Sequence, residues 1–215
     1  SGMRVSSTPM RWPAAWADPA TLALVKGTAV DTLLIDNSDE FDSLRNAARQ
    51  AGLRVAHPDA PGDGVRIVKG EWPGVRSGRG NGGMSAGPTG VPWVDSNGWA
   101  VRLAAAMDPD CACWIDAAPP KQSFPSSYLT AVADTAACGG RWIVALDDAL
   151  AAGIKAGNTN ALATWKTIGQ ATSFFAGHKE WDAYTPAAVV GVVSSFAGKD
   201  EFFSHELLNL LDRAG

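Results

Sequence analysis

The chain has 215 residues, of which 46% are hydrophobic, and its formal net charge is −4. This length and composition predict one domain with a substantial core, and the weak negative charge argues against nucleic acid or an anionic membrane as a partner. No apolar run approaches the ~20 residues that a membrane helix needs.

Short apolar runs alternate along the chain with segments of helical periodicity. Residues 1–17 are irregular and rich in Pro and Trp. The predicted strands are, in chain order, 32–35, 53–56, 65–68, 111–116, 141–146 and 188–193. The predicted helices are 21–26, 39–50, 97–107, 126–138, 159–177 and a last helix that begins at Asp200. Because strands separated by helices usually pair in parallel, this order predicts a parallel sheet covered by helices.

Two parallel architectures fit this alternation. An open nucleotide-binding sheet usually has a glycine-rich fingerprint after its first strand, whereas here that strand is followed by Asp36-Asn-Ser-Asp39. We therefore predict an α/β fold of the parallel (βα) barrel type, TIM-like but short or degenerate, with an open doubly wound parallel sheet as the alternative. The barrel would span residues 1–215 as a single domain with an irregular segment over 1–17. The ending Arg213-Ala-Gly215, where a helix typically leads to another strand, suggests a fragment of a longer protein.

Two of the predicted strands end in acidic residues, in Cys111-Ala-Cys-Trp-Ile-Asp116 and Arg141-Trp-Ile-Val-Ala-Leu-Asp147-Asp148. Sites in alternating α/β folds are built where parallel strands end, so Asp116 and Asp147 are the candidate catalytic residues. Asp116 lies near Trp114 and before two prolines, an apolar setting expected to raise its pKa and make it a general acid. Asp147 would then be the nucleophile or base. The simpler alternative is that each Asp caps the loop or helix that follows it.

The region between strands 65–68 and 111–116 supplies most of the candidate ligand-binding residues. Residues 69–92 are rich in Gly and Pro, and we expect this long stretch at the same rim as Asp116 and Asp147. Trp side chains serve equally as platforms for sugar rings and as core residues. The candidate substrate-binding residues are Glu71, which is also a reserve acid, and Trp72, Trp93, Asp95, Asn97, Trp114 and Asp148.

The segment Ala86-Gly-Pro-Thr-Gly-Val-Pro-Trp-Val-Asp-Ser-Asn-Gly-Trp99, taken with Trp-Ile-Asp116, Gly-Gly-Arg-Trp142 and Leu-Asp-Asp148, resembles predicted bacterial (βα)-barrel glycoside hydrolase-like proteins. The resemblance covers most of residues 12–213. It implies a sugar-active barrel with acidic residues at its strand ends and a carbohydrate ligand. Glycoside hydrolysis uses two carboxyl groups ~5–9.5 Å apart, on opposite faces of the bond. The predicted function is a glycoside hydrolase-like activity, and the alternative is a non-catalytic carbohydrate-binding or scaffold barrel.

Other chemistries have less support in the sequence. The three His residues are scattered and no CxxC pair is present, so we predict no metal and no cofactor. The glycine-rich segment near residue 80 lacks the ending of a P-loop, and no Gly-x-Ser-x-Gly elbow occurs. A cytoplasmic location is the default expectation because no secretory segment opens the chain, with a secreted or periplasmic location as the alternative. The sequence leaves the sugar, the linkage and the oligomeric state open.

Overall fold

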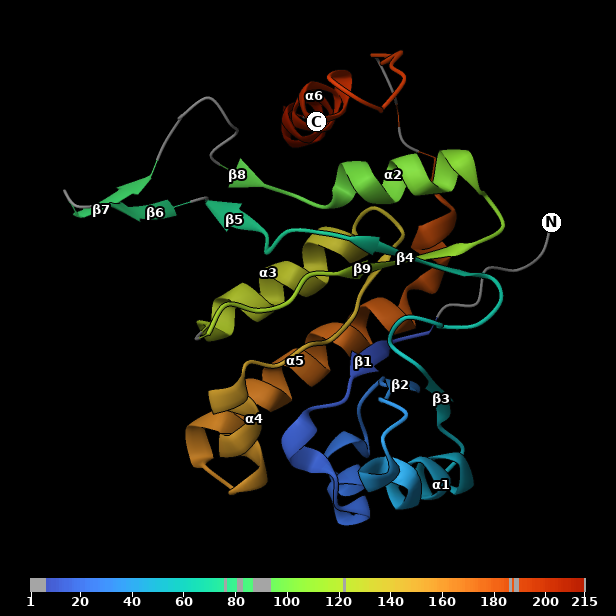
Figure 1. Cartoon of the computed structure of the whole chain (residues 1–215), viewed down its shortest axis with the longest axis vertical. Coiled ribbons are helices and arrows are strands. Elements are labelled where there is room, and N and C mark those ends of the chain that lie inside the picture. The colour runs from blue at the N-terminus through green and yellow to red at the C-terminus, as the bar shows by residue number, and fades with distance from the viewer. Residues whose placement is uncertain are drawn as a thin grey trace.

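The computed structural model describes residues 7–75, 77–80, 83–86, 94–121, 123–185, 187 and 190–214. Its strands form two small parallel sheets of three strands each (Figure 1). The first sheet has the order β1 (Pro9–Arg11), β2 (Thr32–Leu34), β3 (Arg54–Ala56). The second has the order β10 (Arg141–Trp142), β9 (Ala112–Asp116), β4 (Val65–Lys69). A single parallel bridge between Met10 and Val144 links β1 to the segment that follows β10.

The predicted TIM-like barrel is wrong, because the described residues form two three-stranded sheets in place of an eight-stranded barrel. The strands also do not form the single open sheet of the alternative. One reason is that residues 190–193 of the predicted strand 188–193 have no strand structure, and Val193 is 101% exposed; residues 188 and 189 lie outside the described part. A second reason is the short length of β10, which leaves one bridge to join the two sheets.

The parallel pairing around β9 is confirmed. Trp114 of β9 lies opposite Arg141 of β10 and Ile67 of β4. At the end of the same ladder Asp116 lies opposite Lys69. The carboxyl ends of β4 and β9 therefore meet at one rim, which is where the sequence placed its candidate acid.

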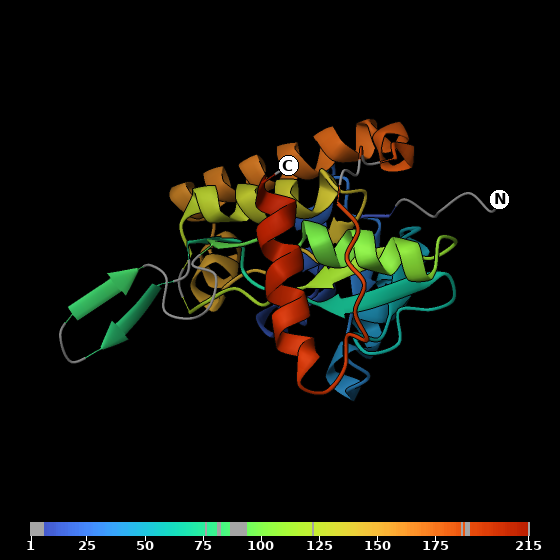
Figure 2. The same cartoon turned by 90° about the horizontal axis from the view of Figure 1, so that it is seen from above.

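Helices cover the outer faces of the sheets. The α-helices are α1 (Asp42–Gln50), α2 (Gly98–Met107), α3 (Pro125–Ala136), α4 (Asp148–Lys155), α5 (Thr159–Gly177) and α6 (Asp200–Ala214). Short 3₁₀ helices are η1 (Ala14–Trp16), η2 (Pro19–Val25), η3 (Asp39–Phe41) and η4 (Lys179–Ala183). Helix α1 packs beside β3, α2 against β9, and α3 against β10 and α5. Figure 2 shows α6 crossing α2 on the outside of the molecule.

The chain between β4 and α2 contains strands that the sequence did not predict. It pairs β5 (Gly74–Val75) with β8 (Val94–Asp95), and β6 (Ser77–Gly80) with β7 (Gly83–Ala86), both antiparallel. This part of the chain begins directly after β4, where the backbone N–H of Gly70 donates a hydrogen bond to the backbone carbonyl of Asp116. The start of the stretch predicted over 69–92 therefore lies at the rim of Asp116, whereas residues 76, 81–82 and 87–92 of that stretch lie outside the described residues.

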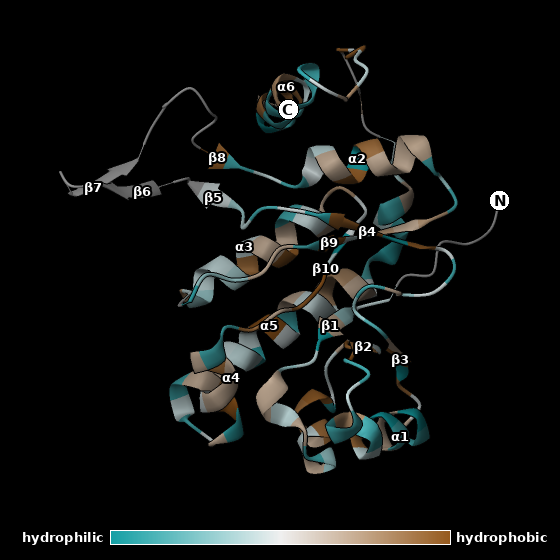
Figure 3. Ribbon diagram, in the orientation of Figure 1, coloured by the Kyte–Doolittle hydropathy of each residue, from teal (hydrophilic) through white to brown (hydrophobic). Residues whose placement is uncertain are grey.

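Helix α2 is hydrophobic along most of its length (Figure 3) because it lies between β9 on one side and α6 on the other. A separate small cluster lies between the two sheets. It consists of Leu34, Trp114 and Ile143, with Ala56, Val65 and Ile67 packed against it. Since Leu34 belongs to one sheet and Trp114 to the other, this cluster packs the two sheets together beside the backbone bridge between Met10 and Val144.

Candidate functional site

The end of β9 carries an ion-pair cluster formed by three strand ends. Asp116 is 8% exposed. Its Oδ1 accepts a hydrogen bond of 2.9 Å from Arg11 Nη2 at the end of β1, and its Oδ2 accepts one of 2.5 Å from Lys69 Nζ at the end of β4. Burial raises the pKa of Asp116, but the hydrogen bonds from Lys69 and Arg11 outweigh it, and the net pKa lies below the usual value. The expected raised pKa is therefore wrong, and Asp116 is ionised at neutral pH, so it is unsuited to donate a proton.

Asp147 is a helix cap. Its Oδ1 accepts a hydrogen bond of 2.9 Å from Leu150 N in the first turn of α4. Its Oδ2 accepts one of 2.6 Å from the Tyr128 hydroxyl, which in turn accepts the backbone N–H of Asp147 at 2.9 Å. Burial raises the pKa of Tyr128, and the neighbouring Asp147 carboxylate adds to the rise, so the phenol stays protonated and keeps donating. Both carboxylate oxygens of Asp147 thus have structural partners, and Asp148 beside it is exposed on α4.

We expect Asp147→Ala to lower the free energy of unfolding by about 2–3 kcal/mol, because it removes a cap and leaves a buried phenol donor without its acceptor. Asp147→Asn should cost less, about 1–2 kcal/mol, because its one oxygen can keep the cap while the Tyr128 hydroxyl loses its acceptor. Urea unfolding of both variants measures the difference. Equal losses in the Asn and Ala variants would contradict the capping role.

We expect Asp116→Asn to lower the free energy of unfolding by about 2 kcal/mol at neutral pH, because it weakens two charge-assisted hydrogen bonds. Lys69 contributes the smaller part, since its side chain is 86% exposed. A carboxylate whose pKa is depressed in the folded state stabilises it above the unfolded pKa, and this stabilisation is lost as the pH falls through the folded pKa. The difference between wild type and variant should therefore shrink below about pH 4. Urea unfolding at several pH values tests this, with exposed Asp148→Asn as the control; a pH-independent difference would overturn the prediction.

The tryptophans named as sugar platforms are packing residues where the structure describes them. Trp114 is fully buried in the cluster between the sheets. Trp72 packs edge-on against Tyr128 and Trp142, with ring centroids 5.4 and 5.5 Å away. Trp93 lies outside the described residues. The sequence could not separate these roles, because an indole ring suits a core as well as a binding surface.

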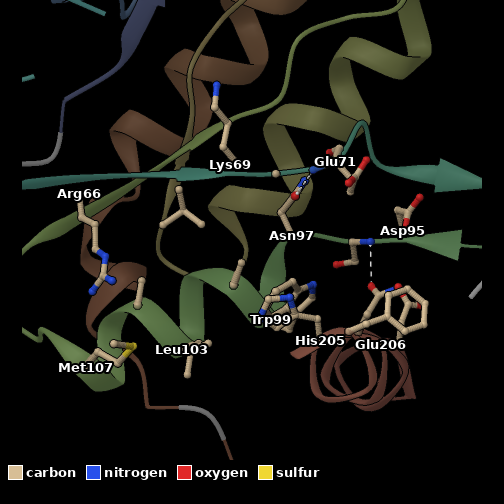
Figure 4. A pocket seen from close by; sticks show the side chains of 17 residues that line it. Arg66, Lys69, Glu71, Asp95, Asn97, Trp99, Leu103, Met107, His205 and Glu206 are labelled. Carbon is tan, nitrogen blue, oxygen red and sulfur yellow. Dashed lines mark hydrogen bonds between the residues drawn. The ribbon is translucent and has the colours of Figure 1, made fainter. Parts of the chain in front are cut away.

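A cavity of about 570 Å³ brings together three of the predicted ligand-binding residues, Glu71, Asp95 and Asn97. It lies between β4, α2 and α6 (Figure 4). Its lining consists of Arg66, Val68, Lys69, Gly70, Glu71, Asp95, Ser96, Asn97, Trp99, Ala100, Leu103, Ala104, Met107, Phe202, His205, Glu206 and Asn209. Pockets of roughly 300–1,000 Å³ that combine an apolar lining with a few polar groups are typical of small-molecule sites.

Asn97 holds the polar end of the cavity in place. Its Oδ1 accepts a hydrogen bond of 2.9 Å from the backbone N–H of Glu71, and its Nδ2 donates one of 2.8 Å to the backbone carbonyl of Glu71. One amide therefore satisfies both backbone groups of Glu71, which follows closely after β4. Its backbone N–H donates to Asp134 Oδ2 of α3 at 2.7 Å. Burial raises the pKa of Asp134, although the hydrogen bonds from Asn97 and Ser96 act against the rise. Asn97 thus positions Glu71 at the mouth of the cavity and ties it to the start of α2.

Helix α6 supplies the wall that sequence reasoning did not foresee. Asn209 is buried, and its Oδ1 accepts from Ser96 N while its Nδ2 donates to Val94 O, each at 3.0 Å. The His205 ring lies 4.8 Å from the Trp99 ring, between centroids. These contacts join residues more than a hundred positions apart, so no local sequence signal pointed to them.

The structure carries no support for a metal or membrane role within the residues it describes. No group of three or more His, Cys, Asp or Glu side chains there is arranged to hold a metal ion. No helix of the described chain has both the length and the apolar character needed to cross a membrane.

Comparison with protein-family models, curated proteins and solved structures finds no match for this chain. The description as a TIM-barrel hydrolase or glycosidase is corrected by the sheets: the described residues form no barrel, and neither they nor the comparisons give evidence for hydrolysis. What remains is an α/β protein with a mixed polar and apolar cavity.

Proposed function

We propose that this protein binds a carbohydrate without transforming it, in the cavity between β4, α2 and α6. The observation that supports this is that Glu71 and Asp95 both line one end of a cavity of about 570 Å³, where Asn97 holds the backbone of Glu71 in place. Carboxylate oxygens accept hydrogen bonds, which is what sugar hydroxyls donate.

The binding role is favoured over hydrolysis by the state of the two strand-end acids. Asp116 is held ionised by Arg11 and Lys69, and Asp147 is occupied as a cap. Acid–base hydrolysis needs one protonated carboxyl group and one free carboxylate on opposite faces of the bond. These two residues therefore do not form the hydrolytic pair that the sequence predicted, and the proposal for the cavity is binding alone.

Isothermal titration calorimetry with a panel of neutral mono- and disaccharides tests the proposal. Glu71→Gln is the informative variant, because Asn97 contacts the backbone of Glu71 and leaves its exposed side chain to the cavity. We expect the Kd of the best saccharide to rise about tenfold in this variant, since a hydrogen bond to a charged group is worth about 1.5–3 kcal/mol.

Asp148→Asn is the matched control, because it removes an exposed carboxylate that does not line the cavity. It should leave the Kd unchanged. Binding by no member of the panel, or equal losses in the two variants, would overturn the proposal. Turnover of an aryl glycoside would show that the protein is a catalyst and would contradict the non-catalytic assignment.

A further inference from the structure

The cavity is polar at one end and apolar at the other. Figure 4 shows Glu71, Asp95, Asn97 and Glu206 toward one end, and Leu103 and Met107 toward the other. A free sugar carries hydroxyl groups around its whole ring, so it matches only the first of these two surroundings. The apolar end therefore calls for a different chemical group on the same ligand.

The apolar end is a continuous stripe along one face of α2. Trp99, Leu103 and Met107 follow one another at intervals of four residues, so they lie above one another on the helix. With a rise of 1.5 Å per residue, the stripe is about 12 Å long. It starts at the polar end of the cavity with Trp99 and ends with Met107, so a ligand seated at Glu71 can extend along it.

This stripe is incompletely covered by the protein. Met107 is 64% exposed at the end of α2, and Phe202, which lines the cavity from α6, is also exposed. Exposed apolar surface beside a cavity favours a ligand that removes it from water. The stripe is continuous with the polar end that holds the sugar, so one ligand molecule is the occupant that covers both.

The charged residue near the apolar end does not call for an anionic ligand. Arg66 lines the cavity beside Met107 (Figure 4). The pKa of Asp108 is lowered chiefly by a hydrogen bond from Cys111 and in smaller part by the charge of Arg66. Arg66 is exposed and belongs to β4, so its guanidinium can stay in water while the ligand follows the apolar stripe on α2.

We propose that the natural ligand is a glycoside with an apolar aglycone, whose sugar occupies the polar end and whose alkyl or aryl group lies along Trp99, Leu103 and Met107. This rests on the proposed carbohydrate binding and names the class of ligand for the same cavity. The sugar provides recognition and the aglycone provides most of the additional affinity.

The test is calorimetry on the whole chain with a series of alkyl glycosides, from methyl to octyl, of the saccharide that binds best in the panel above. Measurements stay below the micelle concentration of each compound. We expect the Kd to fall about three- to fourfold for each added methylene, the equivalent of about 0.8 kcal/mol.

Two variants localise the effect. Leu103→Ser and Met107→Ser should flatten the dependence on chain length while leaving the Kd of the methyl glycoside unchanged; Met107 is exposed at a helix end, so its replacement leaves the core intact. Leu162→Ser on α5 is the matched control, because Leu162 is exposed and does not line the cavity. It should retain the full dependence.

The outcomes separate the two proposals. An affinity that is independent of alkyl chain length would overturn the proposed binding of an apolar aglycone. So would a chain-length dependence that is retained in both Leu103→Ser and Met107→Ser. Either result would leave the proposed sugar binding intact. Octanol that binds as tightly as the octyl glycoside would show that the sugar is not recognised, and would overturn the proposed function itself.

Discussion

Trp114→Ala is expected to lower the free energy of unfolding by about 3–5 kcal/mol, the range for removing a large aromatic side chain from a core. Trp114 is fully buried between the two sheets, in contact with Leu34 of β2 and Ile143 after β10. The guanidinium of Arg54 in β3 lies 5.7 Å from the Trp114 ring centroid and covers it from the other sheet. Since this cluster packs side chains of both sheets together, the cavity left by Ala should loosen their association. Urea unfolding gives the magnitude.

Two further variants make this prediction specific. The Trp114 indole N–H is buried without a hydrogen-bond acceptor, so Trp114→Phe gives up no hydrogen bond and should cost much less than Trp114→Ala. Trp181→Ala removes an indole that is partly exposed on η4 and should also be mild. If Trp114→Ala unfolded at the same urea concentration as Trp181→Ala, the cluster between the sheets would not be a principal source of stability.

Asn97→Asp is expected to cost about 3 kcal/mol or more at neutral pH, although it changes the shape of the side chain very little. The carboxylate would replace the Nδ2 group that donates to Glu71 O and to Asp134 Oδ2, at 2.8 and 3.2 Å. An acceptor would then face two acceptors in a buried place, and one of them is charged. The same change should weaken saccharide binding, because the position of Glu71 depends on this amide.

The loss in Asn97→Asp should depend on pH with a defined sign. Burial and the neighbouring Asp134 would raise the folded-state pKa of the new carboxyl group above its unfolded value. Its protonated form is then favoured by folding, so the deficit is smallest at acidic pH and grows as the pH rises through the folded pKa. Urea unfolding between pH 3 and pH 7 measures this trend.

Asn158→Asp serves as the control for Asn97→Asp. Asn158 caps α5 by accepting from Asn160 N and Ala161 N, and Asp accepts these bonds equally well. This variant should change stability little at any pH. A similar loss of stability in both variants, or a loss at residue 97 that does not vary with pH, would contradict the proposed role of the Asn97 amide in holding Glu71.

Helix positions were the most predictable part of the fold. The pattern predicted a helix over 159–177, and α5 spans Thr159–Gly177; the helix expected over 97–107 is α2, Gly98–Met107. Both segments repeat apolar residues with the helical period and carry a polar residue that can start a helix, so the information is local. Strand 111–116 was likewise correctly read, because its apolar run is buried on both faces in a parallel sheet.

The arrangement of the strands was less predictable. The strand β1 formed in the irregular opening segment, and the expected strand over 188–193 is absent over its described residues. A short apolar run can pair in a sheet or remain exposed, and the outcome depends on whether a neighbouring strand edge is within reach. That neighbour is chosen by the path of the whole chain, so it cannot be read from the run itself.

The sequence by itself determined which side chains were available for a site. Of its seven candidate substrate-binding residues, three line one cavity, namely Glu71, Asp95 and Asn97, while Trp72 and Trp114 are packing residues and Asp148 is exposed on α4. It also named Asp116 and Asp147 as strand-end acids and recognised capping as their alternative role.

Only the tertiary structure decided what those side chains do. The cap role of Asp147 depends on Tyr128, the low pKa of Asp116 depends on Arg11 and Lys69, and one wall of the cavity comes from α6. The physical reason is the same in each case. Periodicity reports how a residue is buried by its own element, whereas charge state and hydrogen-bond partners are set by distant segments that the fold brings within about 3 Å.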